Sequence, residues 1–189
     1  GRSVNAEWLE DNLRKNESKT DGGFQKFLAK HLNVEIGLNL RSDRWAGADF
    51  WERQSTTLPL EDLLKRSEVV VVGIDGGGLD DLFGLTLIGR ERETRRWLVW
   101  SHAWAHRIVL ERRKDIAPRL LDFQKDGDLT IVDMPGDDVE QVADLICRVK
   151  AANLLPPKNA IGVDAAGIGD VVDELTTTER DIKIEQIVA

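Results

Sequence analysis

Two aspartates occupy equivalent positions in this chain of 189 residues, and their setting points to metal chemistry. Asp75 directly follows the apolar run 69–74, Asp164 directly follows the apolar run 160–163, and each precedes a glycine-rich turn. If the two runs are neighbouring strands, the carboxylates converge and repel each other unless a cation lies between them. Two Mg²⁺ or Mn²⁺ ions about 4 Å apart activate a water and stabilise the leaving oxygen in phosphodiester cleavage. We therefore predict that Asp75 and Asp164 are catalytic residues that bind divalent metal ions.

Asp81 is the next candidate metal ligand, because it lies just beyond the glycines that follow Asp75. Asp80 shares this place, and for both residues a helix-capping or solvent-facing role is an equal alternative. Asp75 and Asp164 also have an alternative interpretation, since Asp before Gly is an ordinary turn-former at the end of a strand. Asp133 ends a weaker apolar run, and there we favour the turn role.

Other catalytic chemistries find little support in the sequence. His31, His102 and His106 have neither metal-ligand spacing nor a partnered Ser or Cys nucleophile, so we interpret them as structural. The glycines at 76–78 are not followed by the Lys and Ser or Thr of a phosphate-binding loop, and they lack the spacing of a dinucleotide fingerprint. Alternating Trp and His side chains at 100–104 indicate a packed face, with base stacking as the alternative.

The elements that would position the two aspartates form a mixed α/β pattern. The sequence predicts strands at 69–74, 82–89, 95–105, 129–133, 160–163 and 182–188. Helical spacing covers 108–124 and 170–175, and a further helix runs from Asp137 or Asp138 to before Pro156. We therefore expect three antiparallel strands followed by parallel crossover strands, flanked by helices.

Composition limits the class of protein and where it acts. The net charge of −8 argues against a general polyanion-binding surface, although basic residues gather at 90–96 and at 107–114. A single cysteine, Cys147, excludes an internal disulfide framework, and no apolar run is long enough to cross a bilayer. We expect a soluble, intracellular protein without membrane contact. Residues 1–66, with predicted helices at 4–15, 23–32 and 59–65, read as an appendage to a core domain at 67–189.

Several of these segments resemble the nuclease domain of the phage large terminase subunit. They are 73–75 with the glycine turn and Asp81-Leu82, and 162–169 with its Asp-Ala-Ala-Gly-Ile-Gly sequence. Residues 27–33 and 45–52 are similar to the stretch that links the packaging ATPase to the nuclease in those proteins. The resemblance implies a ribonuclease H-like fold that cuts concatemeric viral DNA with two Mg²⁺ or Mn²⁺ ions. Asp75 and Asp164 match the metal-binding acids, and Asp81 matches a supporting position.

The resemblance also implies partners and missing parts. The partners are double-stranded DNA, the portal and the small terminase subunit, and the place of action is the cytoplasm of the bacterial host. The family has an ATPase before residues 1–66 and a third acid after the last strand, so we expect a fragment that is incomplete at both ends. Packaging activity then cannot belong to this fragment alone.

Two other functions stay open on the sequence. Residues 74–78 resemble the first phosphate loop of actin-like sugar and acyl kinases, but Leu79 stands where Thr or Ser usually follows the glycines. The third interpretation is a non-catalytic docking module of the same fold, in which the aspartates only form turns.

Overall fold

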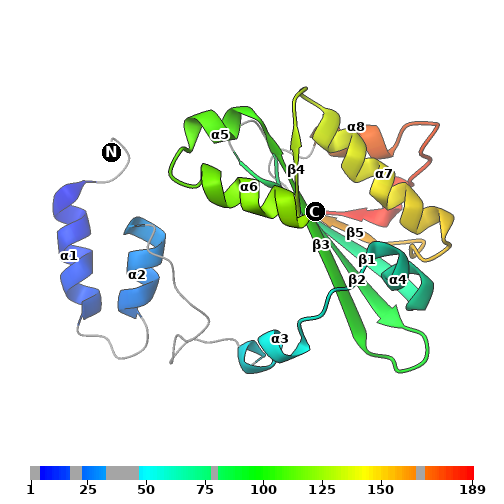
Figure 1. The fold of residues 1–189 in the computed structure, drawn as a ribbon, viewed down its shortest axis with the longest axis horizontal. Helices are drawn as coiled ribbons and strands as arrows, with labels where there is room; N and C mark the ends of the chain where they lie inside the picture. The colour runs from blue at the N-terminus through cyan, green and yellow to red at the C-terminus, as the bar shows by residue number, and fades with distance from the viewer. Residues whose placement is uncertain (1–4, 18–22, 33–46, 78–80, 165–168) are drawn as a thin grey trace. The chain divides into compact units, whose positions relative to one another are not determined.

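The computed structural model describes residues 5–17, 23–32, 47–77, 81–164 and 169–189 (Figure 1). They belong to two units, and the boundary along the chain falls between Thr57 and Leu58. The first unit contains α1 (Ala6–Glu17), α2 (Gly23–Leu32) and α3 (Ala48–Gln54). In it the ring of His31 contacts the rings of Trp8 and Phe27, with centroids 5.2 and 4.9 Å apart. Among the described helices, none combines the length and apolarity needed to cross a bilayer.

The appendage expected from the sequence, residues 1–66, included helix α4 (Leu60–Arg66). In the structure this helix belongs to the second unit, which begins at Leu58. The side chain of Leu63 is wholly buried, and it joins the core cluster that contains Val70 and Leu87. Burying a leucine contributes roughly 1.5–3 kcal/mol, so this short helix gains its stability from the sheet beneath it.

Six strands form one sheet in the described part of the second unit. They are β1 (Ser67–Gly76), β2 (Phe83–Glu91), β3 (Trp97–His106), β4 (Leu129–Val132), β5 (Ile161–Val163) and β6 (Ile187–Val188). Their order is β4-β3-β2-β1-β5-β6, with β1, β2 and β3 antiparallel and the remaining pairings parallel. This confirms the predicted ribonuclease H-like mixed sheet flanked by helices. All strands except β2 run in one direction, so their carboxyl ends meet at one edge, hereafter the carboxyl edge.

One face of this sheet forms the main core. Side chains alternate along β1, so Val70, Val72 and Ile74 point to the buried face. Helix α4 packs on this face together with α7 (Asp137–Ala151) and α8 (Gly169–Leu175), through apolar residues such as Ile146 and Leu175 (Figure 1). Since this core includes β1 and β5, it fixes the strands that carry Asp75 and Asp164.

The opposite face is covered only in part by the described elements of this unit. Helices α5 (Ile108–Arg112) and α6 (Ala117–Asp126) pack over β3 and β4 through Ala105, Val109 and Leu120. Over β2, β1, β5 and β6 no described helix of this unit joins a core cluster on this face, and Ile88 and Val188 are 38% and 44% exposed there; we call this part the open face. The open face is the one to which Gly73 and Asp75 belong, because they alternate with the buried residues of β1.

The helix predicted at 108–124 is wrong as one continuous element, because the structure has two helices with a turn at 113–116. Pro118 lies in the first turn of α6, where its missing N–H costs nothing, whereas inside a longer helix it would remove a hydrogen bond. Gly127 then ends α6 with a left-handed φ of 86°. The proline is therefore the local cause of the break.

The last strand is also shorter than predicted, since residues 184–186 form a 3₁₀ turn (η1) and only Ile187 and Val188 pair with β5. Gln186 explains the turn, because its side-chain oxygen accepts a hydrogen bond from the backbone N–H of Lys183 at 3.0 Å. Its amide nitrogen donates to the carbonyl of Pro156 at 2.8 Å. Helix α3 was not predicted at all.

Candidate metal centre

Asp75 is the penultimate residue of strand β1, and its side chain is exposed. Gly76 follows with φ of 80°, and a Cβ at this position would lie 2.2 Å from the carbonyl oxygen of Leu82. The N–H of Gly77 donates to that same carbonyl at 3.2 Å. Glycine is therefore required at position 76, where β1 ends close to Leu82 and Asp75 is held at the carboxyl edge.

Asp164 follows directly after β5, the strand that pairs with β1 in parallel. The last pair in that register is Ile74 with Val163, and Asp75 and Asp164 each follow one member of this pair along the chain. Neighbouring strands are about 4.8 Å apart, which places the two residues side by side. Both are exposed, whereas Ile74 and Val163 are buried. The structure thus brings together the two aspartates that the sequence singled out.

An open depression of about 680 Å³ lies beside Asp75 on the open face. Its lining residues are Gly73, Ile74, Asp75, Gly84, Thr86, Gly162, Val163, Val188 and Ala189. The Thr86 hydroxyl lies 2.9 Å from the Ser101 hydroxyl on the neighbouring strand. Because glycines form much of the floor, the backbone of the sheet can be approached closely next to Asp75.

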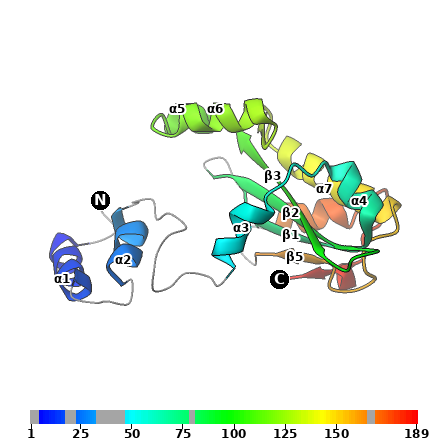
Figure 2. The ribbon, with the colours of Figure 1, turned by 60° about the horizontal axis from the view of Figure 1, so that its bottom comes forward.

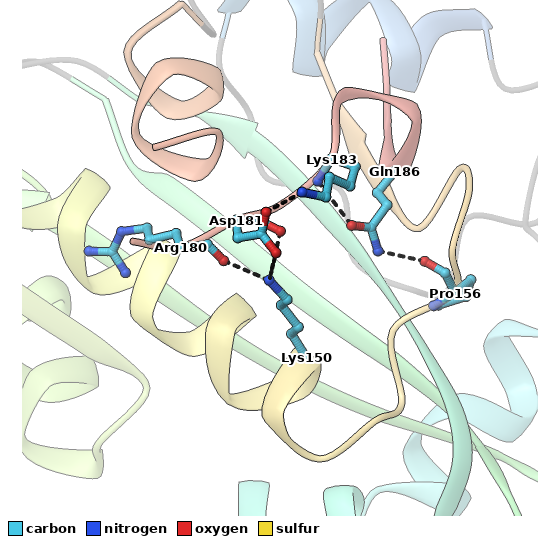
Figure 3. A network of polar contacts seen from close by, with 6 residues as sticks. All are labelled: Lys150, Pro156, Arg180, Asp181, Lys183 and Gln186. Carbon is cyan, nitrogen blue, oxygen red and sulfur yellow. Dashed lines mark hydrogen bonds and ion pairs between the residues drawn. The ribbon is translucent and has the colours of Figure 1, made fainter. Parts of the chain in front are cut away.

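Strand β6 borders this depression through Val188. A polar network holds the segment that precedes β6 (Figure 3). Lys150 on α7 donates from Nζ to the backbone carbonyls of Arg180 and Asp181, at 2.8 and 2.6 Å. The side chain of Lys183 pairs with the Asp181 carboxylate, and both lysines hold the pKa of Asp181 below its usual value through hydrogen bonds. The network ties the segment after α8 to α7, so that β6 pairs with β5 beside Asp164.

Asp81, the supporting candidate, is exposed and precedes the first residue of β2 by two positions. One of its oxygens accepts a hydrogen bond from the N–H of Leu82 at 2.8 Å, so the side chain caps its own turn. This contact uses one carboxylate oxygen, and the ligand role of Asp81 stays a prediction. Asp80 and the glycine-rich stretch at 165–168 lie outside the described residues.

The chemistry of the adjacent aspartates fits a hard divalent cation in part. Mg²⁺ and Mn²⁺ take oxygen ligands, and Asp75 and Asp164 supply two carboxylates at one edge. Across the described ranges no group of three His, Cys, Asp or Glu side chains is placed to hold a metal ion. Two carboxylates and water molecules would therefore form the ligand shell that these residues offer.

The remaining candidates from the sequence have structural partners. Asp133 forms an ion pair with Arg107, whose hydrogen bond holds the pKa of this carboxyl group below its usual value. His106 and Asp138 are both buried and lie 3.1 Å apart between Nε2 and Oδ2. His102 contacts the Thr130 hydroxyl at 2.9 Å, and burial lowers its pKa. These contacts link β3 to α7 and β4.

Sequence reasoning missed part of this site. Thr86 and Gly84 border the depression but were not singled out, and Gly162 was noted only as part of the motif at 162–169. A signal was available, because glycine inside a strand interrupts the alternation of side chains and often marks a close approach by a ligand. Gly84 pairs with Asp75, and Gly162 pairs with Gly73, so both lie one strand away from β1.

Comparisons with known proteins give one distant likeness. No protein-family model matches the chain, and no curated protein sequence matches it. Among solved structures, the crystal structure of the HK97 bacteriophage large terminase is similar, with a TM-score of 0.44 and 15% sequence identity. The match covers 88% of this chain and 43% of the terminase, so the chain spans less than half the length of that protein.

Proposed function

We propose that this chain is the nuclease part of a large terminase, a divalent-metal-dependent endonuclease that cleaves concatemeric viral DNA during genome packaging. The observation that supports the proposal is the register of β1 and β5, whose last pair, Ile74 with Val163, directly precedes Asp75 and Asp164 at the carboxyl edge. Ligand sites in open α/β sheets gather beyond the carboxyl ends of strands. Two exposed carboxylates at such an edge are poised for a cation rather than for the core.

Each part of the site has a role under this proposal. Asp75 and Asp164 would hold the cation, and a bound metal would supply an activated water and stabilise the leaving oxygen. The turn at Gly76 fixes the backbone of Asp75, so that the carboxylate does not have to be ordered when the metal binds. The open face next to Asp75 leaves room for a strand of DNA above the glycine-rich floor of the depression.

The assignment to a terminase rests on the motif resemblance at 73–75, 81–82 and 162–169. Under this proposal the portal and the small terminase subunit are partners, and the chain acts in the cytoplasm of the bacterial host. Asp81 is proposed as a supporting ligand through its second carboxylate oxygen, the first being used to cap Leu82.

Removal of the metal tests the proposed reaction. We expect the chain to nick supercoiled plasmid in the presence of Mn²⁺, to stop when EDTA is in excess, and to resume when Mn²⁺ is restored. The measurement is the conversion of supercoiled to open circular DNA on an agarose gel. Nicking that continues in EDTA, or no nicking at any Mn²⁺ concentration, would contradict the proposal.

A further inference from the structure

The turn between α5 and α6, residues 113–116, stands at the carboxyl edge of the sheet. Helix α5 begins directly after β3, where the N–H of Arg107 donates to the carbonyl of Val132 at 2.9 Å. Helix α6 leads back to the start of β4. The 10 residues of α6 are about 15 Å long, whereas the four residues of β4 are about 13 Å long. The start of α6 is therefore level with the carboxyl edge or beyond it. Figures 1 and 2 show α5 leading away from the strand ends and α6 coming back.

This α5–α6 turn belongs to the same face of the sheet as Asp75. Helices α5 and α6 pack on the face that carries Ala103 and Ala105. Ala103 pairs with Gly84 on β2, and Gly84 pairs with Asp75 on β1. Directly paired residues point to the same face, and β3 is two strands from β1, roughly 10 Å away. The two helices thus form a wall beside the open face over Asp75.

Arg113 and Lys114 give this turn two exposed cations. In the part of the chain that the structure describes, neither side chain has a hydrogen bond or an ion pair. The arginines of the β2–β3 hairpin differ, because Arg90 and Arg95 are both bound to Glu68. Arg113 and Lys114 are therefore available for a ligand without the loss of an internal ion pair.

The negative net charge of the chain makes the position of exposed cations relevant to where a polyanion could bind. With a net charge of −8, the chain as a whole repels a polyanion, so contacts to phosphate must come from particular basic groups. Glu111 precedes the turn and Asp115 lies within it, and with Arg112, Arg113 and Lys114 the segment 111–115 still carries a net positive charge of one. The turn is thus a local cationic site next to an acidic edge.

We propose that Arg113 and Lys114 contact the phosphate backbone of double-stranded DNA and hold the duplex along the wall beside Asp75. This inference rests on the proposed nuclease function and adds the place at which the substrate is held. Lysine and arginine contacts to phosphate release condensed counterions, and this makes the binding constant fall with salt. The contact needs no metal and can be measured apart from cleavage.

The test compares two double variants of the full chain with equal changes in charge. R113Q/K114Q removes the proposed contacts, whereas K65Q/R96Q removes two exposed cations that precede β1 and β3 at the opposite edge. Binding of a fluorescent DNA duplex is followed by anisotropy in EDTA over a range of KCl concentrations. For R113Q/K114Q the slope of log K against log [KCl] should become shallower by about 2, one unit for each lost contact. For K65Q/R96Q it should change by less than about 0.5.

Each outcome decides the proposal. Equal changes in both double variants would indicate a general effect of net charge, and no change in R113Q/K114Q would remove the contact; either result overturns it. Tighter binding of polyglutamate than of the duplex at this turn would assign it to an acidic protein partner instead. The binding measurement is made in EDTA and requires no cleavage. A failure of the nuclease function would therefore appear in the plasmid assay and not in this measurement.

Discussion

Replacing Asp75 or Asp164 by asparagine is expected to lower Mn²⁺-dependent plasmid nicking by at least about a hundredfold. Metal ions contribute several kcal/mol of transition-state stabilisation, and each 1.36 kcal/mol corresponds to a tenfold change in rate. Asparagine keeps the size of the side chain and one oxygen but removes the negative charge that holds the cation. Both residues are exposed, so their replacement should leave the free energy of unfolding nearly unchanged.

Asp133 provides the matched control. It also follows a strand at the carboxyl edge and is exposed, but its carboxylate is paired with Arg107. The variant D133N should keep nicking activity within about twofold, since an exposed ion pair contributes about 0–1 kcal/mol. Equal losses of nicking activity in D133N and D75N would mean that the reaction depends on the overall negative charge at the carboxyl edge and not on Asp75 and Asp164 in particular.

Gly76→Ala is expected to destabilise the second unit by at least about 2 kcal/mol. The left-handed conformation costs a residue with a Cβ about 1–2 kcal/mol. In addition, this Cβ would lie 2.2 Å from the backbone carbonyl oxygen of Leu82, which cannot move without shifting the reversal between β1 and β2. Urea unfolding followed by tryptophan fluorescence measures the change. The same shift would displace Asp75, so Mn²⁺ affinity should fall as well.

Gly127→Ala separates the two contributions. Gly127 has a similar φ of 86°, but a Cβ there meets nothing within 4 Å. This variant should lose only the conformational part, about 1 kcal/mol, and its Mn²⁺ affinity should stay at the level of the unmodified chain. If the free energy of unfolding fell equally in both alanine variants, the close approach of Leu82 to Gly76 would contribute nothing to the destabilisation.

The strands around the candidate site could be predicted because their signals are local. The β-branched run of β1, the polar tip between β2 and β3, and the short apolar run of β5 each mark one element without knowledge of its neighbours. The mixed order of the sheet follows from short connections between antiparallel strands and helical crossovers between parallel ones. Asp75 and Asp164 were found for the same reason, as each directly follows its strand.

What could not be predicted depends on contacts between distant residues. The break between α5 and α6 is an exception, because its cause, Pro118, is local. The length of β6, in contrast, depends on Gln186, which reaches Pro156. The buried pair of His106 with Asp138 likewise joins residues 32 positions apart. The depression next to Asp75 arises only when glycines of three different strands come together. The periodicity of the sequence does not indicate which glycines of different strands lie next to each other.

The most direct test of the central claim is to locate Mn²⁺ by anomalous diffraction from crystals of this chain soaked in the metal. We predict an anomalous peak within about 2.0–2.3 Å of carboxylate oxygens of both Asp75 and Asp164, consistent with the short bonds of hard divalent ions to oxygen. The same soak of the D75N variant should show no peak at this edge. Ordered carboxylates with no peak between them, or a peak that D75N leaves unchanged, would contradict the metal centre on which the proposed function depends.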